Sequence, residues 1–95
     1  AVYIEKNRAL VEETLKDVKG IKAIHADGTY FVWLDCRGLN MSQDELNKFF
    51  VETVKLGFNS GKTFGPDGEG FLRMNIACPK STVEQALDRI VKALA

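Results

Sequence analysis

The sequence predicts an α+β fold, a two-layer sandwich in which helices pack on one face of a small, mostly antiparallel sheet. Amphipathic helical segments open and close the chain, and two strand-like runs flank an Asp-Gly turn signal. The order along the chain is helix, two strands, helix, one or two strands, helix. With 95 residues, the chain has room for one domain, residues 1–95.

The first predicted helix covers residues 3–19. Its apolar side chains recur at helical spacing on one face, opposite a face rich in Glu and Lys. Gly20 follows directly and is typical of a helix C-terminus. The apolar face of this helix consists of Ile4, Val11, Leu15 and Val18.

Residues 21–36 predict a β-hairpin. Asp27 and Gly28 separate two apolar runs, and this dipeptide suits a tight turn that needs positive φ angles. The second strand is apolar on both faces, so we expect cover on both, whereas one helical layer covers only one. The sequence therefore indicates a missing neighbour. One face carries Tyr30, Val32, Leu34 and Cys36, and the other carries Phe31 and Trp33.

Two further helices each begin with a Ser-x-x-Glu capping box. Ser42 and Glu45 start the first, which we expect to end near residues 56–57, and Ser81 and Glu84 start the second. Both have apolar stripes that predict burial: Leu46, Phe49, Phe50 and Val54 in one, and Val83, Leu87, Ile90, Val91 and Leu94 in the other.

The last predicted strand, residues 71–78, alternates two sets of side chains. Leu72, Met74, Ile76 and Cys78 form the set that faces the helices. Arg73 and Asn75 therefore point to the opposite side, where Phe31 and Trp33 already indicate a missing partner.

Composition excludes several classes of function. Basic and acidic residues balance at thirteen each, which argues against a nucleic-acid or anionic-membrane partner. Cys36, Cys78 and His25 are too few for a zinc site, so we expect no metal and two reduced thiols in a cytoplasmic protein. No apolar run is long enough for a transmembrane span, and no signal peptide is recognisable.

The glycine-rich stretch 57–70 does not fit the common phosphate-binding motifs. The spacing before Gly61-Lys62-Thr63 is one residue short of a P-loop, and no helix can follow it directly. The glycines precede a strand, whereas a dinucleotide fingerprint follows one. An RNA-binding strand needs more exposed aromatic residues than Phe71 alone.

The sequence of this stretch is more specific than its composition. It reads Gly61-x-x-Phe64-Gly65-x-x-Gly68-x-Gly70-Phe71-x-Arg73-x-Asn75-x-Ala77-Cys78-Pro79, and upstream lies Gly28-Thr29-Tyr30-x-x-Trp33-x-Asp35. Over essentially the whole chain the sequence resembles the C-terminal small domain of fold-type I pyridoxal-phosphate (PLP) enzymes. It looks closest to the class I/II aminotransferase branch that includes cystathionine β-lyase and other C–S lyases. Lys80 stands where that branch more often has arginine.

The resemblance implies specific roles for residues of this chain. Arg73 matches the arginine that grips the α-carboxylate of the amino-acid substrate. Thr29, Tyr30, Phe64 and Asn75 are weaker candidates for lining the pocket. Gly61, Gly65, Gly68 and Gly70 belong to a loop that lets the domain close over the substrate.

The resemblance also implies that the chain is a fragment of a longer enzyme. The Schiff-base lysine and most of the PLP site are expected in a missing large domain, and none of the lysines here matches a Schiff-base motif. We therefore expect the isolated chain to hold no PLP and to be inactive. The parent is expected to be a cytoplasmic homodimer.

Three alternatives stay open at this point. The parent is a C–S β-lyase acting on an amino acid such as cystathionine or cysteine, or a true aminotransferase, and the Asn75–Pro79 sequence favours the lyase. A stand-alone amino-acid-binding module is the second possibility. In the third, the face with Phe31 and Trp33 is only a dimer surface.

Overall fold

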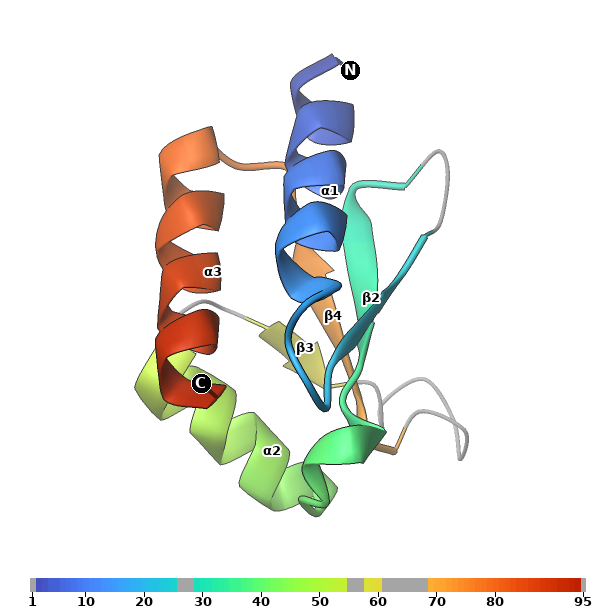
Figure 1. The fold of residues 1–95 in the computed structure, drawn as a ribbon. Coiled ribbons are helices and arrows are strands. Elements are labelled where there is room, and N and C mark those ends of the chain that lie inside the picture. The colour runs from blue at the N-terminus through green and yellow to red at the C-terminus, as the bar shows by residue number, and fades with distance from the viewer. Residues whose placement is uncertain (1, 26–28, 55–57, 61–68, 95) are drawn as a thin grey trace.

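A computed structural model describes residues 2–25, 29–54, 58–60 and 69–94. Figure 1 shows the described elements in chain order. The helices are α1 (Val2–Leu15), α2 (Gln43–Phe49) and α3 (Lys80–Leu94), with a 3-10 turn at Arg37–Leu39 and a π-helical turn at Phe50–Val54. The strands are β1 (Lys22–Ile24), β2 (Phe31–Asp35), β3 (Phe58–Ser60) and β4 (Phe71–Asn75).

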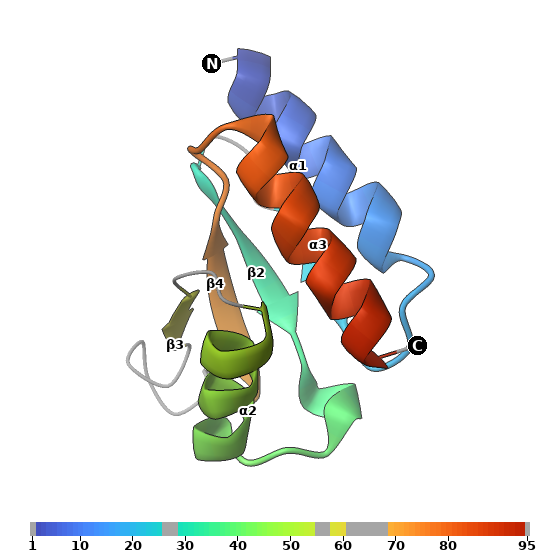
Figure 2. The same cartoon turned by 90° about the vertical axis from the view of Figure 1, so that its left-hand side faces the viewer.

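The strands form one antiparallel sheet in the order β1-β2-β4-β3 within the described residues. Helices α1 and α3 run side by side, in broadly the same direction, across one face of the sheet (Figures 1 and 2). Helix α2 lies at the end of the sheet where β4 begins, close to β3. The predicted α+β sandwich with helices on one face is confirmed.

The core lies between the sheet and the helices, and it confirms the predicted alternation in both long strands. In β2 and β4 the buried residues alternate with half-buried or exposed ones. Tyr30 is an exception, because it was predicted on the helix-facing side but is 63% exposed. It precedes β2 at a bend, so the alternation of the strand does not extend to it. The fully buried strand residues are Val32, Leu34, Leu72 and Met74.

Helix α1 ends four residues earlier than predicted, at Leu15. The amide of Val18 donates to the Leu15 carbonyl at 3.0 Å, which is a tighter turn than an α-helix makes. Gly20 then adopts a φ of 96°. This early exit lets Ile21 enter the core, where it is 5% exposed, immediately before β1 begins.

The capping box at the start of α2 is confirmed, with the Glu45 amide donating to the Ser42 hydroxyl at 3.1 Å. The second predicted capping box is displaced. Helix α3 begins at Lys80, and the Val83 amide donates to the Pro79 carbonyl, so Ser81 lies inside the first turn. Proline is tolerated there because the amide it lacks would have no partner inside the helix. The predicted hairpin turn at residues 27–28 lies outside the described residues, but β1 and β2 pair antiparallel as expected.

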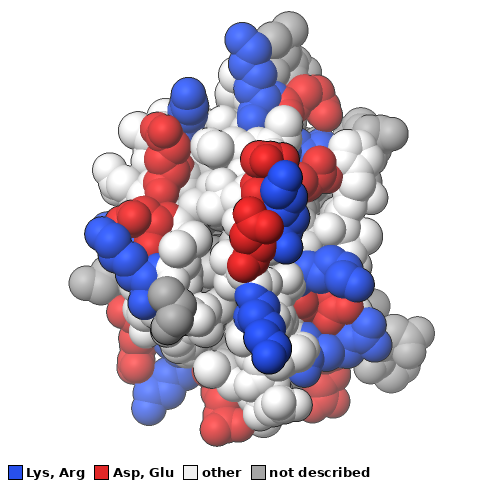
Figure 3. Space-filling model, viewed as in Figure 1, with Lys and Arg blue, Asp and Glu red and all other residues white. Residues whose placement is uncertain are grey.

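Charged side chains of both signs are interspersed on the face seen in Figure 3, in keeping with the balanced composition. That face carries no continuous basic patch of the kind that binds nucleic acid. Among the described residues, no helix has the length and hydropathy needed to cross a membrane.

Candidate functional site

Arg73 lies in the middle of β4, on the sheet face opposite the helices. The register places it directly beside Trp33 of β2 and beside residue 59 of β3. Its guanidinium carbon lies 5.1 Å from the centre of the Phe31 ring. The side chain is half-buried, and at this distance the ring attracts the cation electrostatically.

The residues around Arg73 form a surface that we call the open face. Direct cross-strand neighbours point to the same side of a sheet, so Ile24 of β1 joins Trp33 and Arg73 on this side. No helix among the described elements covers it (Figure 2). A cation beside the aromatic residues Phe31 and Trp33 suits an anionic ligand that carries an apolar part. By the strand register, the open face consists of Lys22, Ile24, Phe31, Trp33, Asp35, Phe71, Arg73 and Asn75.

The weaker candidates from the sequence occupy different environments. The Tyr30 ring meets the Phe31 ring edge-on, with 6.4 Å between their centres. Tyr30 therefore lies next to the ring that Arg73 contacts. The Thr29 hydroxyl donates to the Phe31 carbonyl at 3.0 Å and is already engaged within the backbone. The Asn75 side chain accepts from the Ala77 amide at 2.7 Å.

The glycine loop is described only at its end. Phe64, Gly61, Gly65 and Gly68 lie outside the described residues. Gly70 is described: it is buried, with a φ of 88° that a residue bearing a Cβ rarely adopts.

Gln43 fixes Gly70 and with it the start of β4. The Gly70 amide donates to Gln43 Oε1 at 2.6 Å, and Gln43 Nε2 donates to the Phe71 carbonyl at 3.2 Å. Gln43 is only 1% exposed. The sequence did not indicate this role, because a glutamine in the first turn of a helix normally faces solvent.

Asn7 and Arg8 of α1 were also missed, and both are buried. Asn7 Nδ2 donates to the carbonyls of Ile76 and Cys78, at 2.9 and 2.8 Å. Arg8 Nη1 donates to the Phe31 carbonyl at 3.0 Å. A signal was present for Arg8, because it stands four residues after Ile4, within the apolar stripe.

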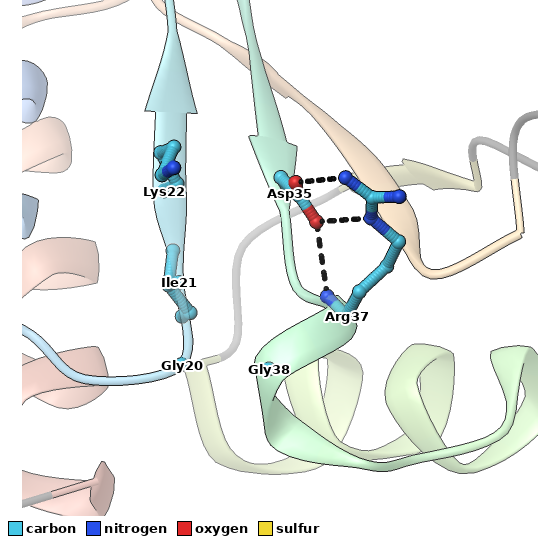
Figure 4. Close-up of a pocket in the computed structure, with 6 residues that line it drawn as sticks. All are labelled: Gly20, Ile21, Lys22, Asp35, Arg37 and Gly38. Atoms are coloured by element: carbon cyan, nitrogen blue, oxygen red, sulfur yellow. Dashed lines mark hydrogen bonds and ion pairs between the residues drawn. The ribbon is translucent and has the colours of Figure 1, made fainter.

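A shallow depression of about 460 Å³ opens near one end of the sheet. Figure 4 shows Arg37 folded over Asp35 there, with Nε and Nη2 donating to the carboxylate at 2.9 and 2.8 Å. These hydrogen bonds from Arg37 hold the pKa of Asp35 below its usual range. Asp35 and Arg37 therefore satisfy each other's charge at this depression, which Lys22 also lines. The lining residues are Gly20, Ile21, Lys22, Asp35, Arg37 and Gly38.

The reactive side chains expected of an enzyme are not gathered in the described part of the chain. Burial, with a smaller contribution from the Asp35 charge, raises the pKa of Cys36 to about 12, and burial raises that of Cys78 as well. Both cysteines are free, as predicted. No group of metal-binding side chains occurs among the described residues. The described lysines are all exposed: Lys6, Lys16, Lys19, Lys22, Lys48, Lys80 and Lys92.

Comparison with known proteins gives a consistent result. Residues 1–90 match the family described as aminotransferase class I and II. The chain is 35% identical over 94 residues to cystathionine beta-lyase PatB of Bacillus subtilis, covering 98% of this chain and 24% of that protein. It is 32% identical over 89 residues to an aspartate aminotransferase of Pyrococcus horikoshii, covering 94% and 23%.

A solved structure resembles the chain equally well. Cystalysin from Treponema denticola, which contains a pyridoxal 5'-phosphate cofactor, superimposes with a TM-score of 0.89 and 35% identity. The match covers 97% of this chain and 24% of cystalysin. The chain thus spans about a quarter of the length of the relatives it matches.

Proposed function

Because the chain belongs to the aminotransferase class I and II family, we propose that it is the small domain of a PLP-dependent enzyme in which Arg73 binds the α-carboxylate of an amino-acid substrate. One observation carries the proposal. Arg73 is a half-buried cation beside the aromatic residues Phe31 and Trp33, in the middle of a sheet face that no described helix covers.

The chemistry of a guanidinium suits this task. It meets a carboxylate with two parallel hydrogen bonds, and this fixes the orientation of the ligand as well as its charge. Partial burial strengthens the interaction, because fewer water molecules compete for the same donors. Tyr30 supports the proposal as a neighbour of the Phe31 ring, whereas Thr29 and Asn75 make local hydrogen bonds. Phe64 and the loop glycines remain sequence-based proposals.

We expect the described residues not to form a PLP site by themselves. Every described lysine is exposed, whereas a lysine that forms a covalent imine is usually desolvated so that its amine is neutral. When bound in the parent, PLP supplies an electron sink for the substrate. The part proposed for this chain is to hold the substrate carboxylate in a fixed orientation and to exclude water from one side of the site.

For the parent we propose a C–S β-lyase acting on an amino acid such as cystathionine or cysteine. The relative named as a cystathionine beta-lyase supports this choice, and the one named as an aspartate aminotransferase supports a true aminotransferase as the alternative. We further propose a cytoplasmic homodimer, in which a large PLP-binding domain lies against the open face.

The test is to express the complete open reading frame and record its visible spectrum with and without cystathionine or cysteine. A yellow protein whose absorbance shifts, with release of pyruvate, is the expected result. The same colour with keto-acid exchange and no pyruvate would make the parent an aminotransferase. A colourless protein that still binds amino acids would instead support a stand-alone binding module.

A further inference from the structure

The Arg73 guanidinium lies over the aromatic ring of Phe31. The centre of the Phe31 ring lies 5.1 Å from the guanidinium carbon. Phe31 itself is held edge-on by Tyr30 and Trp33, with ring centres 6.4 and 5.9 Å away. A planar guanidinium over a ring face keeps its edge donors pointing outward.

The backbone of Phe31 is fixed from the other side of the sheet by Arg8. Its Nη1 donates to the Phe31 carbonyl at 3.0 Å, and its Nη2 donates to the carbonyl of Thr29. Glu5 accepts from Arg8 Nε at 3.1 Å, and this third hydrogen bond fixes the orientation of the Arg8 guanidinium. Arg8 is 1% exposed. A buried, fully engaged guanidinium therefore holds the segment that carries the ring under Arg73.

The same sheet offers an internal comparison. Arg37 lies 5.1 Å from the centre of the Phe71 ring, the same distance as in the first pair. However, Arg37 is also bound to the Asp35 carboxylate, and its side chain is 68% exposed. The two pairs thus share the same distance between guanidinium and ring, and Arg37 in addition uses its guanidinium for Asp35 within the chain.

We propose that Phe31, anchored by Arg8 through its carbonyl, is a positioning residue that presents the Arg73 guanidinium to the substrate carboxylate. The inference rests on the proposed function of Arg73. Phe31 does not touch the reacting atoms; its ring restricts the conformations of the Arg73 side chain before the ligand arrives. A cation that is already oriented loses less conformational entropy on binding than a free one.

The experiment uses the complete PLP-loaded protein and two probes, L-alanine and L-alaninamide, which differ only at the α-carboxylate. The ratio of their dissociation constants, read from the visible spectrum, measures recognition of the carboxylate alone. We expect Phe31→Leu to lower this selectivity by roughly 3- to 30-fold. Phe31→Tyr keeps an aromatic ring at this position and should retain the selectivity.

Phe49→Leu is the matched control, because it removes a ring of the same size from the Phe49–Phe50 pair, which lies on α2 and its π-helical turn and outside the open face. It should leave the selectivity ratio unchanged. Arg8→Lys, which replaces the guanidinium fork by a point charge, should lower the ratio in the same direction as Phe31→Leu. An unchanged ratio in Arg8→Lys would overturn the anchoring role.

Arg73→Ala separates the two proposals. If it abolishes the selectivity while Phe31→Leu leaves it intact, the positioning role of Phe31 is wrong and the proposed function stands. If Arg73→Ala itself leaves the selectivity intact, the proposed function fails and the inference fails with it. An equal loss in Phe31→Leu and Phe49→Leu would also overturn the inference, because it would reflect a general disturbance of the fold.

Discussion

Arg73 is the residue on which the proposed activity depends most directly. Its replacement by alanine in the complete protein would remove both hydrogen bonds that we propose it makes to the substrate carboxylate. We expect the activation free energy that corresponds to kcat/KM to rise by about 2–5 kcal/mol. This corresponds to a fall in kcat/KM of roughly 30- to several thousand-fold. Steady-state kinetics with cystathionine or cysteine would measure it.

Arg73→Lys provides the sharper version of the same prediction. Lysine keeps the positive charge but cannot make two parallel hydrogen bonds, so it should not restore the activity. Full recovery with lysine would mean that charge alone recognises the substrate, and it would contradict the bidentate interaction.

Asp35 gives a prediction about the pH dependence of stability. Hydrogen bonds from Arg37 lower its pKa in the folded state, relative to the ordinary value of 3.8. The contribution to stability is therefore fully present above that value and is lost as the pH falls through the folded pKa. Because Arg37 is 68% exposed and solvent screens the pair, we expect no more than about 1 kcal/mol.

Urea unfolding of wild type and Asp35→Asn between neutral and acidic pH would measure this contribution. The difference in the free energy of unfolding should be largest near neutrality and should shrink on the acid side. Arg37→Gln, which removes the partner, should show the same trend. A difference that stays constant down to strongly acidic pH would show that the ion pair is not its source.

At the scale of elements, the contact between two glycines holds the loop after α1 against the loop after β2. A Cβ added at Gly38 would lie 2.8 Å from the Gly20 Cα and 3.0 Å from the Gly20 carbonyl oxygen. Both contacts are with backbone, which cannot move aside as a flexible side chain can. Gly38→Ala should therefore push the two loops apart, at a cost of about 1–3 kcal/mol.

The free energy of unfolding from urea titration tests this prediction. Gln85→Ala, on the exposed side of α3, is a suitable control and should change stability by less than about 0.5 kcal/mol. If Gly38→Ala is as stable as the control, the two loops are not held by this contact.

The elements themselves were predictable because each carries its own local signal. The alternation of side chains in β2 and β4 is enough, from the sequence alone, to place Phe31, Trp33 and Arg73 on one face, and the register of the two strands agrees. The end of α1 was not predictable. Gly20, which has a positive φ, packs against the backbone of Gly38, and Gly38 lies far along the chain.

The buried hydrogen bonds near the candidate site were likewise not predictable from the sequence. Gln43 and Asn7 hold the ends of β4 through hydrogen bonds to backbone carbonyls and amides that are distant in sequence. Such partners are generic main-chain groups, so nothing in the local sequence identifies them. Arg8 was detectable in principle as a charge within an apolar stripe, but its partners at residues 29 and 31 were not.

At the scale of the whole molecule, the chain is a sandwich with one layer of helices and, on the other side, a sheet face that carries Ile24, Phe31 and Trp33 besides its polar residues. The described part of that face exposes Ile24 by 39% and leaves Trp33 half-buried. The chain also spans only about a quarter of its relatives. Both facts are explained together if the remaining three quarters of such a protein cover the open face.

The last prediction concerns what the 95-residue chain does by itself. Its continuous core of buried side chains from all three helices and both long strands should support cooperative folding. We expect it not to retain PLP, because every described lysine is exposed and lacks the desolvated setting that activates a lysine for imine formation. After incubation with PLP and gel filtration, we expect a folded, colourless chain without pyruvate release, whereas the complete protein treated in the same way stays yellow. A stoichiometric yellow colour retained by the fragment would place the cofactor lysine within this chain. It would overturn the proposal that the large domain holds PLP.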